Sequence, residues 1–126
     1  MSLTGRTMLV TGAAGVLGQS VARKAVEAGA EVVLLDVVPD FTTELGIYCQ
    51  VDLTDSVAVQ AILERLAPFD SVANIAGGFD MGPAVFETED ALWDAMFEIN
   101  VTTLRTVLRY AVPHLLDAGG GSIVKV

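Results

Sequence analysis

Short apolar runs alternate along the chain with longer stretches in which apolar residues recur at helical spacing. The short runs cover residues 7–11, 31–36, 47–51, 71–74 and 122–126. In the second run Val32, Val33, Leu34 and Leu35 follow one another, which is typical of a strand that is covered on both faces. The runs therefore predict strands of a parallel sheet.

The stretches between these runs predict three helices. The first carries Leu17, Val21, Ala25 and Ala28 and ends at Gly29, and the second carries Val59, Ile62, Leu63 and Leu66 and ends at Pro68. The third is long, and its pattern consists of Trp93, Phe97, Asn100, Leu104, Leu108, Ala111 and Leu115 before the glycines at 119–121. Pro113 removes a backbone donor and should bend or loosen the last turns of this helix. Residues 77–89 predict a loop.

This alternation predicts an α/β fold with a doubly wound parallel sheet of the Rossmann-like type, because parallel neighbours need right-handed crossovers that place helices on both faces. We expect residues 1–126 to form a single domain. The sequence ends inside the last predicted strand, so we expect the domain to be truncated after about the fifth strand and incomplete at its C-terminus. Ligands of such sheets bind at the carboxyl ends of the strands.

Charge and composition narrow the range of partners. The chain has 16 acidic and 7 basic residues, a net charge of −9, and no basic cluster, so we expect neither nucleic acid nor a membrane surface as a partner. No apolar stretch reaches membrane-spanning length, and the single cysteine, Cys49, is interpreted as a small core residue. We therefore expect a soluble, cytoplasmic protein, and we predict no metal site.

The turn after the first strand has the glycine pattern of a dinucleotide-binding loop. Residues 11–18 read T-G-A-A-G-V-L-G and lead directly into the first helix. Glycines permit a tight bend and a close approach of backbone to a pyrophosphate, which the amides and dipole of the helix N-terminus then hold. The predicted phosphate-binding residues are Gly12, Gly15, Val16, Leu17 and Gly18. A purely structural turn is the alternative.

Asp36 ends the second strand, 18 residues after Gly18. A carboxylate at this place can accept hydrogen bonds from the adenosine ribose hydroxyls and would repel a 2′-phosphate. Its neighbours include no Lys or Arg, and Ala14 in the glycine turn is uncharged. These residues favour NAD over NADP as the cofactor. The alternative for Asp36 is a solvated aspartate at a strand end.

From about Gly5 to Val126 the sequence resembles the short-chain dehydrogenases/reductases. Besides the turn and Asp36, the resemblance rests on several short segments: Asp52-Leu53, Asn74-Ile75-Ala76-Gly77, Trp93-Asp94, Asn100-Val101 and Gly120-Gly121-Ser122-Ile123-Val124. It implies that Asp52 and Leu53 flank the adenine of a cofactor and that Asn74 braces the central sheet. It also implies that Ala76 and Gly77 line the nicotinamide ribose. Taken singly, each residue has an alternative role as a cap, a sheet hydrogen bond or a turn.

The glycine spacing departs from the pattern of the compact branch of this family. That branch usually carries T-G-x-x-x-G-x-G, whereas this chain has Val16 in place of a glycine and reads T-G-x-x-G-x-x-G. The same spacing occurs in the extended branch, which contains sugar-nucleotide enzymes. The segments downstream resemble the compact branch, and we give them more weight.

The resemblance also shows which catalytic residues this sequence lacks. The family uses a serine beyond the fifth strand and a Tyr-x-x-x-Lys pair, in which the lysine lowers the tyrosine pKa. Tyr48 and Tyr110 are followed four residues later by Asp52 and His114, and Ser122 stands at the start of the last predicted strand rather than beyond it. Only Asn100 matches a supporting position, one that holds a water in the proton relay. His114 is assigned no catalytic role, and Trp93, Met96 and Phe97 are interpreted as packing residues rather than cofactor contacts.

The leading hypothesis is an oxidoreductase. The parent protein would transfer a hydride between NAD(H) and a carbonyl or secondary alcohol, and these 126 residues would bind the cofactor without turnover. The alternatives are a non-catalytic nucleotide-binding or regulatory module, a fragment of an extended-branch sugar-nucleotide enzyme, and an interaction domain without a ligand. We expect a homo-oligomer, with the long helix of the complete protein at a subunit interface. We also expect the incomplete sheet to self-associate through its uncovered edge and faces.

Overall fold

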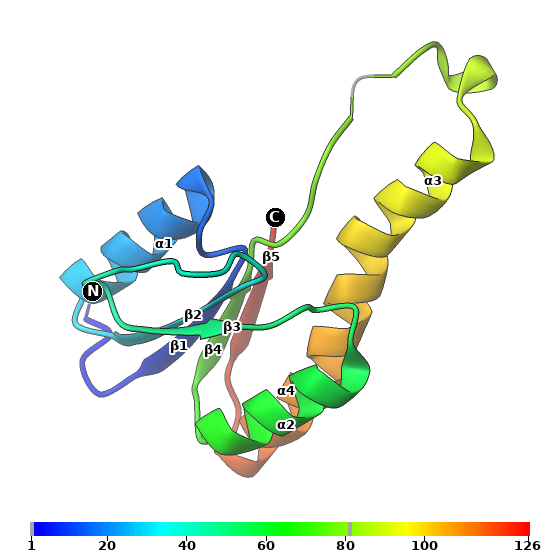
Figure 1. Ribbon diagram of the computed structural model, residues 1–126. Helices are drawn as coiled ribbons and strands as arrows, with labels where there is room; N and C mark the ends of the chain where they lie inside the picture. The colour runs from blue at the N-terminus through cyan, green and yellow to red at the C-terminus, as the bar shows by residue number, and fades with distance from the viewer. Residues whose placement is uncertain (1, 81) are drawn as a thin grey trace.

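In a computed structural model that describes residues 2–80 and 82–126, the chain folds around one parallel sheet (Figure 1). Its strands lie in the order β3-β2-β1-β4-β5, and each neighbouring pair is parallel. The strands are β1 (Thr7–Thr11), β2 (Glu31–Asp36), β3 (Ile47–Gln50), β4 (Ser71–Asn74) and β5 (Ser122–Lys125). The chain reverses its direction of travel across the sheet between β1 and β4, which is the topological switch point of a Rossmann-like fold. The predicted fold class is confirmed.

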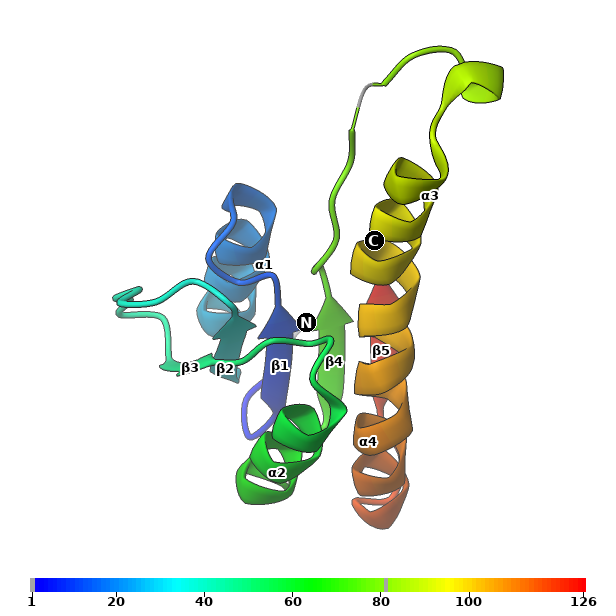
Figure 2. The ribbon, with the colours of Figure 1, turned by 45° about the vertical axis from the view of Figure 1, so that its right-hand side comes forward.

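The helices cover the two faces of the sheet unequally. They are α1 (Val16–Glu27), α2 (Ser56–Leu66), η1 (Val85–Glu87), α3 (Asp90–Phe97), η2 (Glu98–Thr102) and α4 (Thr103–Asp117). The ribbon places α1 on one face and α2 with α4 on the other, as Figure 2 shows from a second direction. None of the helices in the part of the chain described is long and apolar enough to cross a membrane.

Each face of the sheet has its own apolar core. Under α1 the core is built mainly from small residues, which let the helix lie close to the strands: Val10, Ala13, Ala22, Ala25, Ala30, Val32, Leu34 and Ala73. Under α2 and α4 the side chains are larger: Leu9, Val33, Leu35, Cys49, Val51, Leu53, Val59, Leu63, Phe69, Val72, Val107, Ala111 and Leu115. Cys49 is a free, buried core residue, as predicted.

The long helix predicted over 93–116 has three parts. A π-helical segment, η2, separates α3 from α4 and contains Asn100. Pro113 lies inside α4, which continues to Asp117, so the main irregularity comes at η2 rather than at the proline. The buried residues of α4 include Thr103, Thr106 and Val107, whereas the predicted Leu104 and Leu108 are only half-buried. A π-helical turn contains more residues than an α-helical turn. The residues of α4 that face the sheet are therefore shifted from the positions that a regular helical pattern predicts.

Trp93 and Phe97, which the sequence analysis interprets as packing residues rather than cofactor contacts, are not core residues of this chain. Their exposed fractions are 55% and 56%. The reason is visible in Figure 1: α3 extends beyond the ends of the strands, so no sheet lies beneath it. The loop predicted over 77–89 is confirmed for its described residues, apart from the single turn of η1; position 81 lies outside them.

β5 forms one edge of the sheet and is exposed along its whole length. It pairs with β4 on one side, in the register that places Asn74 opposite Lys125. Ile123 is 37% exposed and Val124 is 57% exposed. The apolar side chains of β5 are therefore available to other molecules.

Candidate functional site

A cleft of about 730 Å³ opens at the carboxyl ends of the strands, on either side of the switch point. Its size lies within the range of small-molecule and cofactor sites. Loops after four strands and the α3–η2 region form its lining, which consists of Gly12, Gly15, Val16, Leu17, Asp36, Val37, Val51, Asp52, Leu53, Thr54, Ile75, Ala76, Gly77, Ala95, Met96, Glu98, Ile99 and Thr103. No Lys or Arg belongs to this lining.

The glycine turn is packed so closely that two of its glycines admit no side chain. Gly12 has a φ of +63°, and a Cβ there would lie 2.7 Å from the backbone nitrogen of Ala76. A Cβ on Gly18 would lie 2.7 Å from Cα of Ala13 and closer still to the carbonyl oxygen of Gly12. Gly12 thus lets the turn approach the segment after β4, and Gly18 lets α1 approach the turn.

The first turn of α1 faces the cleft without a capping side chain. Its N-cap residue is Gly15, which makes no side-chain hydrogen bond, and no acidic residue lies in the first turn. The first amides of a helix have no intrahelical acceptor, and the helix dipole adds partial positive charge to them. Gly15, Val16 and Leu17 all line the cleft. This arrangement can hold an anionic group such as a phosphate.

Asp36 lies at the end of β2, where it is linked to the glycine turn. Its Oδ2 accepts a hydrogen bond from the Ala14 amide at 2.9 Å, and its Oδ1 accepts one from the Val37 amide at 2.7 Å. A carboxylate has about four acceptor positions, so two remain for a ligand. The sequence predicted the place of Asp36 at the cleft but gave no sign of its bond to Ala14.

Asp52 and Thr54 form a small turn after β3, and both belong to the cleft lining. Oδ1 of Asp52 accepts hydrogen bonds from the Thr54 hydroxyl at 2.7 Å and from the Thr54 amide at 2.9 Å. These bonds, the hydroxyl first, lower the pKa of the Asp52 carboxyl below its ordinary value against a small opposing effect of burial. Asp52 is therefore held as an anion with a fixed orientation.

A buried hydrogen-bond network joins β1 to the segment after β4. The Thr11 hydroxyl donates to Oδ1 of Asn74 at 3.0 Å and accepts from the Ala76 amide at 3.1 Å. Thr11 and Asn74 are both fully buried. Nδ2 of Asn74 has no partner among the described residues. The Asn74 side chain thus bonds to β1 behind the cleft lining, whereas Ala76 belongs to the lining itself.

Asn100 connects η2 to the same segment after β4. Its Nδ2 donates to the carbonyl oxygens of Gly78 at 2.9 Å and Met96 at 3.0 Å, and its Oδ1 accepts from the Gly78 amide at 3.1 Å. A Cβ on Gly77 would lie 2.6 Å from Oδ1 of Asn100. The side chain of Asn100 therefore fixes the course of the chain as it leaves the cleft.

All residues predicted from the sequence to bind a cofactor line this cleft, except Gly18 and Asn74, which support it from behind. Sequence reasoning missed the wall formed by the α3–η2 region, including Ala95, Met96 and Ile99. Met96, which the sequence analysis interprets as a packing residue rather than a cofactor contact, belongs to this wall. No local pattern marks these residues, because their position depends on how the helix returns over the sheet.

The residues that were assigned no catalytic role lie away from the cleft. His114 is near the C-terminal end of α4, with its ring 5.8 Å from that of Phe69. Ser122 begins β5 at the opposite end of the sheet from the cleft. Within residues 2–80 and 82–126, no group of three or more His, Cys, Asp or Glu side chains is placed to hold a metal ion.

Comparison with known proteins assigns residues 6–126 to the family model for short chain dehydrogenase. One similar protein is the 2-keto-3-deoxy-L-fuconate dehydrogenase of Xanthomonas campestris pv. campestris, which is 28% identical over 135 residues that cover 98% of this chain and 43% of the relative. Another is the 2,5-dichloro-2,5-cyclohexadiene-1,4-diol dehydrogenase of Sphingobium indicum, which is 30% identical over 139 residues that cover 98% of this chain and 55% of the relative. This chain spans about half the length of each.

Solved structures share the fold. A short-chain type dehydrogenase/reductase from Mycobacterium ulcerans superposes with a TM-score of 0.86 at 26% sequence identity, covering 99% of this chain and 52% of that structure's chain. The arrangement of strands and helices described above is therefore the arrangement found in about half of such a protein.

Proposed function

The chain belongs to the short-chain dehydrogenase family, and on that premise we propose that it forms the NAD-binding part of an oxidoreductase. The observation that carries the proposal is the cleft in which the glycine turn, Asp36, the Asp52 turn and the segment after β4 come together. The reaction of the whole protein is the transfer of a hydride between NAD(H) and a carbonyl or secondary alcohol.

The described residues fit two parts of a dinucleotide, its diphosphate and its adenosine ribose. The uncapped first turn of α1 offers amides to the diphosphate, and Gly15 leaves the approach to these amides free of side-chain atoms. Asp36 retains acceptor positions for ribose hydroxyls after its bonds to Ala14 and Val37. This division of roles explains how an acidic chain binds an anionic cofactor.

The charges around the cleft support NAD rather than NADP. Asp36, Asp52 and Glu98 all belong to the lining, with no basic side chain among its residues. An additional 2′-phosphate beside Asp36 would meet a carboxylate without a compensating Lys or Arg, and like charges at close range are unfavourable. We therefore assign NAD as the preferred cofactor.

The chemistry divides between cofactor and protein. When it is bound, the nicotinamide accepts or donates the hydride. Ala76 and Gly77 line the end of the cleft proposed for the nicotinamide ribose, and Asn100 holds this segment through Gly78. Asn100 is proposed as the helix residue that holds a water in the family's proton relay. The 126 residues contain no Tyr-x-x-x-Lys, so by themselves they bind cofactor without turnover.

We assign a small carbonyl or alcohol as the substrate class of the whole protein, since the relatives named above are dehydrogenases of hydroxylated small molecules.

We further propose a cytoplasmic homo-oligomer. The exposed residues of α3 include Asp90 and Asp94, and those of α4 include Arg105 and Arg109. Two copies packed antiparallel would place the acidic half of each against the basic half of its partner.

Titration of this chain with NADH and NADPH, followed by nicotinamide fluorescence, tests the proposal. We expect saturable binding of NADH and binding of NADPH that is at least about tenfold weaker, which corresponds to about 1.4 kcal/mol. Gly15→Asp, which places a carboxylate at the helix N-terminus, should abolish binding because it repels the diphosphate. Failure of the unaltered chain to bind either nucleotide contradicts the proposal.

A further inference from the structure

The chain segment that follows Asp36 is held from behind by two side chains of β3. The Tyr48 phenol donates a hydrogen bond to the Val38 carbonyl oxygen at 2.5 Å, and the Gln50 side-chain amide donates one to the Val37 carbonyl oxygen at 3.2 Å. Val37 lines the cleft, whereas Tyr48 and Gln50 do not. The two donors therefore act on the cleft wall through the backbone of Val37 and Val38.

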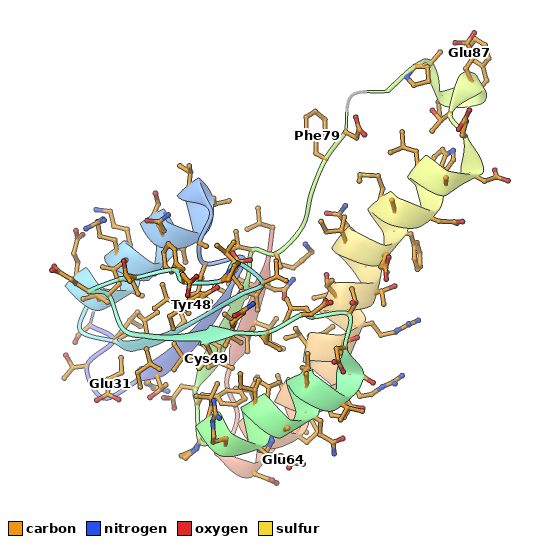
Figure 3. The ribbon with its side chains drawn as sticks, in the orientation of Figure 1. Glu31, Tyr48, Cys49, Glu64, Phe79 and Glu87 are labelled. Atoms are coloured by element: carbon orange, nitrogen blue, oxygen red, sulfur yellow. The ribbon has the colours of Figure 1, made fainter. Side chains whose placement is uncertain are left out.

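The register of the sheet places these donors on the same face as Asp36. β2 and β3 pair Leu34 with Tyr48 and Asp36 with Gln50. Side chains alternate along a strand, so Asp36, Tyr48 and Gln50 point to one face. Figure 3 shows Tyr48 and Cys49 on opposite sides of β3, and Cys49 belongs to the core on the α2 side.

The position of the Tyr48 ring is fixed by packing. Phe41, in the loop between β2 and β3, lies with its ring centroid 5.0 Å from that of Tyr48 and tilted by 57°. Desolvation first, and then the charges of Asp36 and Cys49, raise the pKa of the Tyr48 phenol. The phenol therefore remains protonated over the physiological pH range and can donate to Val38.

These contacts extend to the carboxylate of Asp36. The Val37 amide donates to Oδ1 of Asp36 at 2.7 Å, while the Val37 carbonyl accepts from Gln50. The Asp36 carbonyl accepts from the Val51 amide at 2.8 Å, so the backbone on both sides of the Asp36 side chain is fixed. The carboxylate is thus bonded to the Val37 amide, which lies between the Asp36 carbonyl held by Val51 and the Val37 carbonyl held by Gln50.

We propose that Tyr48 and Gln50 are positioning residues for the cofactor, which hold Val37 and Val38 so that the Asp36 carboxylate faces the adenosine ribose. This inference rests on the proposed function. A segment that is already ordered does not have to be ordered on binding, and preorganisation of this kind strengthens affinity. Neither residue belongs to the motifs that identify the family in this sequence.

The test compares Tyr48→Phe with the unaltered chain in titrations with NADH and in competition by ADP-ribose, which retains the adenosine end. Loss of one hydrogen bond should weaken both ligands by the same factor, about threefold to tenfold. Gln50→Ala removes the second donor from a mostly exposed position and should have a similar effect. Tyr110→Phe is the matched control, because Tyr110 lies on α4 outside the cleft lining, and it should leave both affinities unchanged.

A double-mutant cycle distinguishes positioning from general loosening of the fold. In an Asp36→Ala background, Tyr48→Phe should have no further effect on NADH affinity, because the group that it positions is absent. An equal loss of NADH affinity from Tyr48→Phe in the unaltered chain and in the Asp36→Ala background would overturn the inference. So would unchanged NADH affinity of both Tyr48→Phe and Gln50→Ala when the unaltered chain binds NADH. If the unaltered chain binds neither NADH nor ADP-ribose, the proposed function fails first and this inference fails with it.

Discussion

The Asp36 carboxylate accepts a hydrogen bond from the backbone amide of Ala14, with 2.9 Å between Oδ2 and the nitrogen. This bond links the end of β2 to the glycine turn after β1, so the proposed ribose-binding and phosphate-binding parts of the cleft are connected directly. Asp36→Asn keeps the size of the side chain and removes its charge. It should weaken NADH binding about tenfold, because hydrogen bonds to a charged acceptor are stronger than those to a neutral one.

Asp40→Asn is the control for this change in charge. Asp40 is exposed in the loop after β2 and has a φ of 56°, which asparagine tolerates. Both variants raise the net charge by one, so only Asp36→Asn should alter a fluorescence titration with NADH. Equal affinities for the two variants would show that Asp36 does not contact the ribose.

The close approach at Gly12 predicts a large loss of stability for Gly12→Ala. The new Cβ would lie 2.7 Å from the Ala76 nitrogen, and the φ of +63° is unfavourable for alanine. We expect the free energy of unfolding to fall by about 2–4 kcal/mol in urea denaturation. Gly5→Ala isolates the backbone effect, since Gly5 has a φ of +80° and nothing within 4 Å of a Cβ. It should cost only about 1 kcal/mol, and a similar loss for both variants would rule out the steric explanation.

The strands were predicted well because each is a short run of β-branched or aliphatic residues between clear turn signals. Helix faces were predicted less well. On α1 the buried residues are Gly18, Ala22 and Ala25, whereas the apolar pattern emphasised Leu17 and Val21. Close packing of a helix on a sheet favours small residues, and a hydrophobic pattern gives more weight to large ones.

Within the cleft, the sequence identified the parts that immediately follow strands. Turn residues carry local signals, such as the glycines at 12 and 18 or an aspartate at a strand end. The wall formed by Met96 and Ile99 has no such signal, because it depends on the course of a helix that leaves the sheet and returns over it. Its position is a tertiary property that one-dimensional patterns do not encode.

The Thr11 hydroxyl should contribute to stability through its two buried partners. Thr11→Val removes the donor to Asn74 and the acceptor from Ala76 while keeping the volume of the side chain. Because this leaves buried polar atoms without partners, we expect a loss of about 1–3 kcal/mol in the free energy of unfolding. Thr7→Val, in the same strand but only half-buried, should change stability by less than about 0.5 kcal/mol. Unchanged stability of Thr11→Val would show that the network does not brace the sheet.

The hydrogen bond from Thr54 to Asp52 predicts a dependence of stability on pH. The folded-state pKa of Asp52 lies below its ordinary value of 3.8, so its contribution is present above that pH and is lost as the pH falls through the lowered pKa. Thr54→Val removes the hydroxyl donor and should lower the Tm by about 2 °C at pH 7. This difference should stay constant between pH 6 and 8 and shrink below pH 3.8. A difference that persists unchanged into acid would contradict the role of the Asp52 charge.

The exposed edge strand predicts that this chain associates with itself. β5 pairs only with β4 in the described sheet, and its apolar side chains include Val124, which is 57% exposed. An unpaired edge with apolar side chains can add strands from another copy, and a lysine on an edge opposes such pairing. Val124→Lys should therefore weaken association on the order of tenfold in sedimentation or light-scattering measurements over a range of concentrations.

Phe97→Lys provides the comparison, because Phe97 on α3 is 56% exposed and lies on a different surface. The two variants introduce the same charge at positions whose side chains have similar exposed fractions. If the edge strand is the contact, only Val124→Lys should shift the chain toward monomer. If Phe97→Lys alone has this effect, the helical face proposed for the complete oligomer already mediates contact in these 126 residues. A chain that is monomeric without either substitution would contradict both, because neither exposed surface would then be sufficient for association.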